Sequence, residues 1–368
     1  MNVLIAGGGT AGHVFPALAL ARRLADTHGA EVRFAGTSSG QEARLVPAAG
    51  FPFEPVEAKP LVRKVSFRAL TSPFATLRSV KACRAVVKDA DVVVGMGGYV
   101  SVPVAIAALR ARIPLVVHEQ NAVPGLANRT LARTARTVAL SFPETERLLP
   151  RRARVLVTGN PVRDEIVAVQ TNRDALAKEA RSELDLEEGR ATVVVFGGSQ
   201  GALHLNRTMV DALRGLRGRT DLQVLVLTGP AHLDLVRLNL PRDAALVVRV
   251  LPFLDRMELA YAVADLIVAR AGATTVAEVT VCGLPAMLIP YPYATARHQE
   301  ANARALQRAG GATIVMDDAL SGDLLAARIA DLVDDRERLR RMADRSAAWG
   351  RPDAAETLAE AVTEAAKS

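Results

Sequence analysis

Residues Val3–Leu24 read VLIAGGGTAGHVFPALALARRL, and the rest of the chain repeats the pattern that they set. The apolar run Val3–Ala6 predicts a buried strand, and the apolar residues from Phe15 onward predict a helix with Pro16 in its first turn. The glycine-rich segment GGGTAGH, which ends at His13, lies between them. A strand, a glycine turn and a helix in this order direct unpaired backbone N–H groups at an anion. We therefore expect a turn that faces a phosphate or a substrate.

The same glycines also match a weaker pattern. Gly7, Gly9 and Gly12 fit the G-x-G-x-x-G spacing of dinucleotide-binding proteins. That pattern expects an acidic residue about 20 positions later, at the end of the second strand, where it holds a ribose. The second strand is predicted at Glu31–Ala35, and Gly36-Thr37-Ser38 follow it instead of an acid. The missing acid argues against NAD.

The composition indicates a globular, basic protein. The 368 residues are enough for two domains with separate cores, and 50% of them are hydrophobic while 23% are charged. With 46 Lys and Arg against 39 Asp and Glu, the net charge is +7, which suits an anionic lipid, a phosphorylated substrate or a nucleic acid. Aromatic residues make up only 4%, which argues against a base-stacking surface, and we expect no nucleic-acid partner.

Two features bear on the location of the protein. The first predicted strand follows directly after Met1-Asn2, with no signal peptide before it. The long uncharged stretch Val279–Ala296 contains Pro285, Pro290 and Pro292, so it cannot form a membrane-spanning helix. We expect a cytosolic protein, or one that lies on a membrane without crossing it.

Strands and helices alternate along the chain, and the pattern starts again at Thr192 with a strand followed by the glycine turn GGSQGA, Gly197–Ala202. Such alternation predicts parallel strands joined by right-handed crossovers, with ligands at the carboxyl ends of the strands. In the first half we expect strands at Val3–Ala6, Glu31–Ala35, Asp91–Val94, Pro114–Val117, Thr137–Leu140 and Arg154–Val157. In the second half we expect them at Thr192–Phe196, Gln223–Leu227, Ala245–Val250, Leu266–Ala269 and Ala286–Ile289.

The predicted fold class is therefore α/β, with two doubly wound Rossmann-like domains facing across a cleft. Gly159–Arg163 reads as the joint between them. We expect a first domain at residues 1–162 and a second domain at residues 163–344. A final segment, residues 345–368, is expected to pack back on the first domain through an amphipathic helix at Asp353–Lys367.

One segment departs from the alternation. Pro60–Lys88 places apolar residues between arginines and lysines and contains no acidic residue. A basic and apolar segment of this kind is typical of an interfacial contact with an anionic membrane. The alternative is a core helix whose basic face is solvated, and the sequence does not decide between the two. The residues expected to contact the membrane are Phe67, Leu70, Phe74 and Leu77.

The second glycine turn matches the nucleophile elbow G-x-S-x-G of hydrolases. Asp265 and His298 would then complete a triad with Ser199. The elbow normally follows several strands of its sheet, whereas this one opens its half of the chain. We therefore favour the alternative, in which Ser199 and the adjacent N–H groups bind a phosphate.

A third constellation follows the strand Leu266–Ala269. Small residues in Arg270–Glu278 leave room for a ligand near the backbone, and a helix expected to begin near Thr274 presents its N–H groups. Glu278 could accept two hydroxyl hydrogen bonds from a ribose diol. The plainer alternative is an acid near a helix N-terminus that interacts only with the helix dipole. The polar loop Tyr291–Ala303 follows the next strand, a position that is often functional.

These motifs together resemble the MurG family of UDP-N-acetylglucosamine:undecaprenyl-pyrophosphoryl-N-acetylmuramyl-pentapeptide N-acetylglucosaminyltransferases, which have the GT-B fold. The resemblance spans almost the whole chain. It implies that residues 1–162 are an acceptor-binding, membrane-facing domain and that residues 163–344 are a UDP-sugar-binding domain. Its motifs are GGGTAGHVFPALA (Gly7–Ala19), GMGGYVSVP (Gly95–Pro103), HEQNAVPG (His118–Gly125), GNPVR (Gly159–Arg163), GGSQGA (Gly197–Ala202), GATTVAE (Gly272–Glu278) and HQEANA (His298–Ala303). Two positions depart from it: Ala11 stands where the family usually has glycine, and His298 stands where some members carry glutamine.

The resemblance implies an inverting transfer of N-acetylglucosamine from UDP-N-acetylglucosamine to the 4-hydroxyl of undecaprenyl-pyrophosphoryl-N-acetylmuramyl-pentapeptide, lipid I to lipid II, in peptidoglycan synthesis. His13 is our first choice for the base, because a helix N-terminus disfavours the protonated imidazole. Glu119 is the competitor, either as the base or as the group that orients His13. The resemblance implies that the donor contacts Thr10, Ala11, Gly12, Asn121, Arg163, Ser199, Leu254, Ala273, Thr274, Thr275, Val276, Ala277, Glu278 and Gln299.

The sequence predicts a reaction without a metal or another cofactor. No Asp-x-Asp motif occurs in a suitable loop, and Asp334-Asp335 falls in a charged helical run. Cys83 and Cys282 show no metal-ligand spacing. Backbone N–H groups at glycine turns and helix N-termini can stabilise a departing diphosphate instead.

The implied partners are UDP-N-acetylglucosamine, the lipid-linked muramyl-pentapeptide and an anionic membrane surface, with the protein peripheral on the cytoplasmic side of the cell membrane. Two rival functions remain open. One is a related GT-B enzyme that glycosylates a diacylglycerol, and the other is a UDP-sugar binder without catalytic activity.

Overall fold

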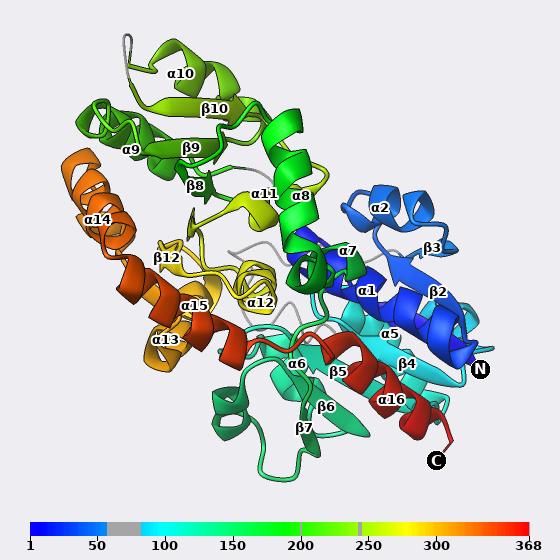
Figure 1. Ribbon diagram of the computed structural model, residues 1–368. Coiled ribbons are helices and arrows are strands. Elements are labelled where there is room, and N and C mark those ends of the chain that lie inside the picture. Colours follow the sequence, from blue (N-terminus) through cyan, green and yellow to red (C-terminus); the bar gives the residue numbers. More distant parts are fainter. Residues whose placement is uncertain (57–81, 199–200, 242–244, 368) are drawn as a thin grey trace. The chain divides into compact units, whose positions relative to one another are not determined.

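The computed structural model describes residues 1–56, 82–198, 201–241 and 245–367 of the chain. The chain forms two compact units, each an α/β domain with one parallel sheet (Figure 1). The first unit contains Met1–Arg163 and Pro352–Ser368, and the second contains Asp164–Arg351. The predicted fold class, two doubly wound Rossmann-like domains, is confirmed.

The first unit has a seven-stranded parallel sheet in the order β3-β2-β1-β4-β5-β6-β7. The order reverses direction beside β1, and in such sheets ligands bind at the carboxyl ends of the strands near this switch. Its strands are β1 (Asn2–Ala6), β2 (Glu31–Gly36), β3 (Phe53–Pro55), β4 (Val92–Gly95), β5 (Leu115–Glu119), β6 (Thr137–Leu140) and β7 (Val155–Val157).

Both faces of this sheet are apolar because helices cover both. Alternate residues of a strand point to opposite faces, so Val3 and Ile5 pack in one cluster while Leu4 and Ala6 pack in another. The first cluster includes residues of α1 (Ala11–His28) and α16 (Ala354–Ala366), which lie side by side in Figure 1. The second includes α5 (Ser101–Arg110). Full burial of one such Val, Leu or Ile side chain contributes about 1.5–3 kcal/mol.

The remaining helices of the first unit are short. They are α2 (Glu42–Ala48), α6 (Leu126–Leu131) and the 3₁₀ helix η1 (Pro143–Leu148). Residues 82–87 are also helical. The four residues expected to contact a membrane, Phe67, Leu70, Phe74 and Leu77, lie outside the described residues. Within the described ranges, no helix is long and apolar enough to span a bilayer.

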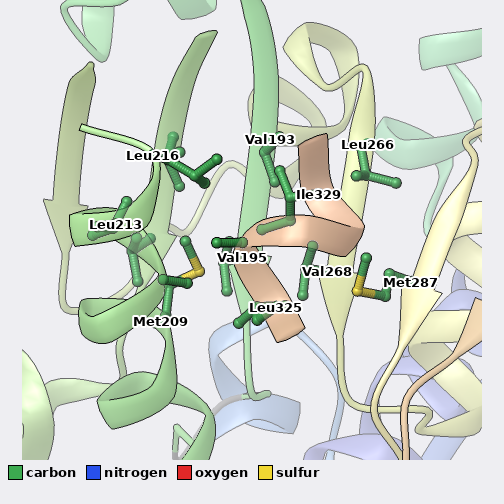
Figure 2. Close-up of a cluster of buried hydrophobic side chains, with 14 of the residues drawn as sticks. Val193, Val195, Met209, Leu213, Leu216, Leu266, Val268, Met287, Leu325 and Ile329 are labelled. Carbon is green, nitrogen blue, oxygen red and sulfur yellow. The ribbon is translucent and has the colours of Figure 1, made fainter. Parts of the chain in front are cut away.

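The second unit has a six-stranded parallel sheet in the order β10-β9-β8-β11-β12-β13. One face of it packs against α9 (Leu203–Gly215) and α14 (Gly322–Asp334). Figure 2 shows Val193, Val195 and Val268 of the sheet facing Met209, Leu325 and Ile329 of these helices. The strands are β8 (Ala191–Phe196), β9 (Leu222–Leu227), β10 (Val247–Leu251), β11 (Leu266–Ala269), β12 (Ala286–Leu288) and β13 (Ala312–Ile314).

The remaining elements of the second unit are helices. The α-helices are α7 (Asp164–Val167), α8 (Val169–Glu183), α9 (Leu203–Gly215), α10 (Leu233–Leu238), α11 (Met257–Val263), α12 (Ala273–Val281), α13 (His298–Ala309), α14 (Gly322–Asp334) and α15 (Arg336–Trp349). The 3₁₀ helices are η2 (Pro230–His232), η3 (Thr295–Arg297) and η4 (Asp317–Ala319).

Three details differ from the expectation. Helix α1 begins at Ala11 rather than near Phe15, so Gly12 and His13 lie in its first turn and Pro16 lies further inside it. The three-residue strands β3 and β13 were not predicted, because so short a run carries little periodicity. The segment that returns to the first unit starts at Pro352 rather than at residue 345, since α15 continues to Trp349 within the second unit.

Candidate active site

The first glycine turn, Gly7–Thr10, connects β1 to α1 and approaches other backbone closely. A Cβ on Gly7 would lie 2.8 Å from Cβ of Met96, and Gly9 adopts a φ of +92°, which favours glycine. Thr10 is the extended N-cap residue of α1, and its carbonyl accepts from the N–H of His13. The turn therefore holds His13, which is half-buried, at the N-terminus of the helix.

A buried carboxylate from the same unit occupies this turn. Glu42, only 1% exposed, accepts hydrogen bonds from the N–H of Gly9 at 2.9 Å and from the N–H and hydroxyl of Thr37 at 3.0 and 2.8 Å. Burial alone would raise the pKa of Glu42, but the donors on Gly9 and Thr37 lower it below its ordinary value. The N–H of Gly9 therefore points at an internal anion and not at a ligand.

Three further glycines make room for this carboxylate. A Cβ on Gly8 or Gly40 would lie 2.2 Å from an atom of the Glu42 side chain, and a Cβ on Gly36 would lie 2.5 Å from its Cγ. Glu42 was not predicted from the sequence. Gly36 and Gly40 before it indicate that a side chain packs closely against the backbone there. β2 does not end in an acidic residue. Instead, α2 places the carboxylate of Glu42 beside the glycine turn, and this carboxylate stabilises the turn.

His13 belongs to a hydrogen-bonded chain of side chains. Its Nδ1 lies 3.1 Å from Oε1 of Gln120, and Nε2 of Gln120 donates to the carbonyl of Met96 at 2.8 Å. The same Nε2 lies 3.1 Å from Nδ1 of His118. His13 follows β1, Met96 follows β4, and His118 and Gln120 lie at the end of β5. Because β1, β4 and β5 are neighbours in the sheet, their carboxyl ends bring these residues together.

His118 closes the chain deep inside the unit. It is 0% exposed, and its Nε2 lies 3.0 Å from the carbonyl of Gly159. Burial lowers the pKa of His118 to about 4, with a smaller opposing effect from the Gly159 carbonyl and a further lowering from the charge of His13. His118 is therefore neutral at pH 7.

Glu119, the competing base, is enclosed by donors. It is 2% exposed, and the N–H of Asn121, the N–H of Gly125 and Nδ2 of Asn128 lie 2.9–3.0 Å from its two oxygens. A fourth donor, Nδ2 of Asn121, lies at 3.4 Å. Burial raises the pKa of Glu119 above its ordinary value, and the donors partly offset that rise. This carboxylate stabilises the loop that carries Asn121.

Arg163 ends the first unit beside α1. Its guanidinium lies 4.7 Å from the centre of the Phe15 ring, which is a cation–π contact. Of the other residues expected to contact the donor in this unit, Thr10 and Gly12 are exposed and Asn121 is half-buried.

In the second unit, the expected nucleotide site begins at the N-terminus of α12. Gly272 is its extended N-cap residue, and Asn302, which is fully buried on α13, donates to the carbonyl of Ala271 at 3.1 Å. Thr274 and Thr275 are half-buried, whereas Ala273, Val276 and Ala277 are buried. The helix thus presents its threonines and its first N–H groups at the end of β11, while the apolar residues pack inward.

Glu278 lies further along α12 than the dipole interpretation requires. The first turn of α12 contains no acidic residue, so an N-terminal charge effect does not explain Glu278. The side chain is 7% exposed and accepts a hydrogen bond of 2.7 Å from the hydroxyl of Tyr261. Tyr261 is fully buried on α11 and packs edge-on against Phe196 at the end of β8. Tyr261 was not predicted as a site residue, because a single tyrosine in an apolar helix is typical of the hydrophobic core.

Gln299 holds the loop that follows β12. Its Oε1 accepts from the N–H of Tyr291 at 2.9 Å. Between these residues, Ala296 and Arg297 adopt left-handed φ values of +51° and +52°, which are unfavourable for residues with a side chain. The loop is therefore held in a strained conformation at the carboxyl edge of the sheet.

The structure argues against a hydrolase triad. Asp265 accepts from the N–H of Thr192 at 2.7 Å, so it lies where β8 and β11 begin. Ser199 comes after β8 in the chain and lies outside the described residues. Leu254, which we expect to contact the donor, is half-buried in the loop after β10. Asp265 therefore lies at the opposite edge of the sheet from Gly198, the described residue that precedes the elbow serine in the chain.

Residues 3–140 match the glycosyltransferase family 28 N-terminal domain, and residues 192–358 match the glycosyltransferase family 28 C-terminal domain. Together with the two parallel-sheet domains, these matches define a glycosyltransferase with the GT-B fold. The chain belongs to the MurG family of N-acetylglucosaminyltransferases. It is 42% identical to UDP-N-acetylglucosamine--N-acetylmuramyl-(pentapeptide) pyrophosphoryl-undecaprenol N-acetylglucosamine transferase of Halothermothrix orenii, over 100% of both chains.

Solved structures agree at the level of the fold. The crystal structure of Acinetobacter baumannii MurG superposes with a TM-score of 0.80 at 30% identity, covering 99% of both chains. A UDP-GlcNAc 2-epimerase from Neisseria meningitidis, solved with UDP-GlcNAc bound, superposes with a TM-score of 0.67 at 12% identity, covering 99% of this chain and 100% of the epimerase. Since an epimerase shares the architecture, the fold alone does not define the reaction.

Proposed function

We propose that this protein transfers N-acetylglucosamine from UDP-N-acetylglucosamine to the 4-hydroxyl of undecaprenyl-pyrophosphoryl-N-acetylmuramyl-pentapeptide, with inversion at the anomeric carbon, as a step of peptidoglycan synthesis. The names of its full-length relatives support these substrates. The structural observation that carries the proposal is His13, held at a helix N-terminus by a hydrogen bond to Gln120. An imidazole placed in this way can remove a proton from an attacking alcohol.

In this mechanism His13 acts as the base. Glu119 is the less suitable candidate, because four donors already surround its two oxygens and a carboxylate in that setting serves to hold a loop. Its role would then be to position Asn121, which we propose contacts the donor sugar. Thr10, Ala11 and Gly12 would contact the sugar and the diphosphate.

The donor's nucleotide is proposed to bind the second unit. The N–H groups at the start of α12, with Thr274 and Thr275, would stabilise the departing diphosphate without a metal ion, since a helix N-terminus favours negative charge. Glu278 would hold the ribose diol through the oxygens that Tyr261 orients. Ser199, Leu254 and Gln299 would complete the pocket, with Arg163 contacting the diphosphate or the nucleotide.

The test is a turnover assay of UDP-N-acetylglucosamine with the lipid-linked muramyl peptide, run in the presence of a chelator. We expect a product with inverted anomeric configuration, formed at an unchanged rate when the chelator is added. Retention of configuration would contradict the single-displacement mechanism, and loss of the rate would contradict metal independence. A diacylglycerol offered in parallel should not be glycosylated. The absence of transfer to either lipid would favour a non-catalytic UDP-sugar binder.

We also propose that the protein docks on the cytoplasmic face of the cell membrane through Phe67, Leu70, Phe74 and Leu77. The support is the basic, apolar and acid-free sequence around them. Replacing all four by serine should abolish sedimentation with anionic lipid vesicles while circular dichroism stays unchanged. Unaltered sedimentation would refute this contact.

A further inference from the structure

The orientation of the Gln120 amide is fixed by its surroundings. Gln120 is 1% exposed, and one end of its amide lies 2.8 Å from the carbonyl oxygen of Met96. Only Nε2 can occupy that end, because an amide oxygen there would face another acceptor. The second proton of Nε2 points to Nδ1 of His118, 3.1 Å away, so Oε1 is the atom that faces His13.

This orientation determines where the two histidines carry their protons. Oε1 of Gln120 is an acceptor, so Nδ1 of His13 must be the donor, and a neutral His13 then has its lone pair on Nε2. By the same logic Nδ1 of His118 accepts from Gln120, and its Nε2 donates to the carbonyl of Gly159 at 3.0 Å. Two backbone carbonyls, of Met96 and Gly159, fix the direction of the chain, because a carbonyl can only accept.

The packing leaves the pair little freedom to rearrange. A Cβ on Gly97 would lie 3.2 Å from Cε1 of His13, 3.3 Å from its Nδ1 and 3.5 Å from Oε1 of Gln120. The backbone of Gly97 therefore covers this hydrogen bond on one side. His118 stays neutral down to about pH 4 and keeps accepting from Gln120 throughout the range in which an enzyme of this kind works.

We propose that Gln120 is a positioning residue that holds His13 in the Nδ1–H tautomer, so that Nε2 is the atom that takes the acceptor's proton. The second half of this statement rests on the proposed function, and the first half does not. Gln120 thus takes the position of the carboxylate in a serine-protease triad. As a neutral amide it orients the imidazole but stabilises the charged imidazolium less than a carboxylate would.

The test measures the tautomer and the rate separately, on the full-length protein labelled with ¹⁵N-histidine. Two-bond and three-bond ¹H–¹⁵N correlations report which ring nitrogen carries the proton, and a His13→Asn variant assigns the signals. We expect a protonated Nδ1 and a pyridine-like Nε2 in the wild-type protein. A protonated Nε2 would overturn the inference whatever the activity.

Two substitutions connect the tautomer to turnover. Gln120→Met is close in size but offers no acceptor, so the Nε2–H tautomer should become populated and kcat should fall by about 100-fold, the lower range of what a general base contributes. The KM for UDP-N-acetylglucosamine should stay within about twofold. Gln120→Glu offers an acceptor in either protonation state, so it should retain the tautomer and recover most of the rate. Its carboxylate form should raise the apparent pKa on the acid side of the kcat profile, because it stabilises the imidazolium.

A matched control separates this role from simple loss of a buried amide. Gln223 of β9 is also fully buried, and its amide pairs with both backbone groups of Glu187 at 2.8 and 2.9 Å. Gln223→Met should lower stability without changing the His13 signals or the pH profile. If Gln120→Met changes the tautomer and keeps the full rate, His13 is not the base and the proposed mechanism fails while the tautomer assignment holds. If it loses rate with an unchanged tautomer, the positioning role is wrong.

Discussion

The two units begin with the same local order of strand, glycine turn and helix, yet the two turns meet different groups. In the first turn the N–H of Gly9 donates to the internal carboxylate of Glu42. In the second turn, Gly201 at φ +75° packs against the carbonyl of Thr228, and a Cβ there would lie 2.1 Å from that oxygen. A glycine turn in a sequence thus shows that something approaches the backbone closely, but not whether a ligand or the chain itself does so.

The two turns therefore have different roles. The first is a scaffold whose buried carboxylate fixes the helix that carries His13. The second, with its close packing at Gly201, stays our proposed place for a phosphate. The expectation that the first turn directs its unpaired N–H groups at a ligand is therefore wrong for the N–H of Gly9.

The largest effect is expected from removing the internal anion. Glu42→Ala leaves the N–H of Gly9 and both donors of Thr37 without their acceptor and opens a cavity between three glycines. We expect the first unit to lose about 4 kcal/mol, because each of the two buried donors of Thr37 costs about 1–3 kcal/mol when unpaired and the cavity adds to the loss. Urea unfolding followed by limited proteolysis measures the first unit, and fluorescence of Trp349, the single tryptophan, follows the second. Glu42→Gln keeps an acceptor and should cost less, and an unchanged first unit in Glu42→Ala would show that the carboxylate does not support the turn.

The second-largest effect is expected from acid, which should lower the stability of the first unit. The folded pKa of His118 is about 4, below its unfolded value of about 6.5, so the unfolded state binds the proton first. Stability from this group is complete above pH 6.5 and is lost as pH falls toward 4, by up to about 3 kcal/mol. In the second unit His204, His232 and His298 are not buried. The same two probes, compared at pH 7 and pH 5, should show only the first unit weakening, and parallel weakening of both would contradict this origin.

The sequence predicted the architecture well because apolar strands buried on both faces produce continuous runs such as Val92–Val94 and Ala191–Phe196. His13 and Glu278 were singled out because each follows a glycine- or alanine-rich strand end, and their roles stay predictions. It missed the partners of these residues, since Glu42 is 33 positions from Gly9 and Gln120 is 107 positions from His13. Such contacts follow from the strand order β1-β4-β5, which places the ends of distant strands side by side and which a single sequence does not state.

The smallest effect is expected in the second unit. Tyr261→Phe removes only the hydroxyl that donates to Glu278, so the second unit should lose about 1–2 kcal/mol. If Glu278 holds the ribose, UDP should bind about 5-fold to 10-fold more weakly, because the carboxylate is no longer oriented. Calorimetric titration with UDP measures this change. An unaltered affinity would mean that Tyr261 and Glu278 only stabilise the core.

The most direct test of the mechanism compares kcat for two variants in the lipid-acceptor assay. His13→Asn retains a donor toward Gln120 but has no imidazole lone pair, whereas Glu119→Gln retains the shape of the side chain that holds the loop. Our account predicts that His13→Asn loses at least about 100-fold in kcat with unchanged binding of UDP-N-acetylglucosamine. Glu119→Gln should keep a larger share of the rate. Full turnover by His13→Asn would contradict the account.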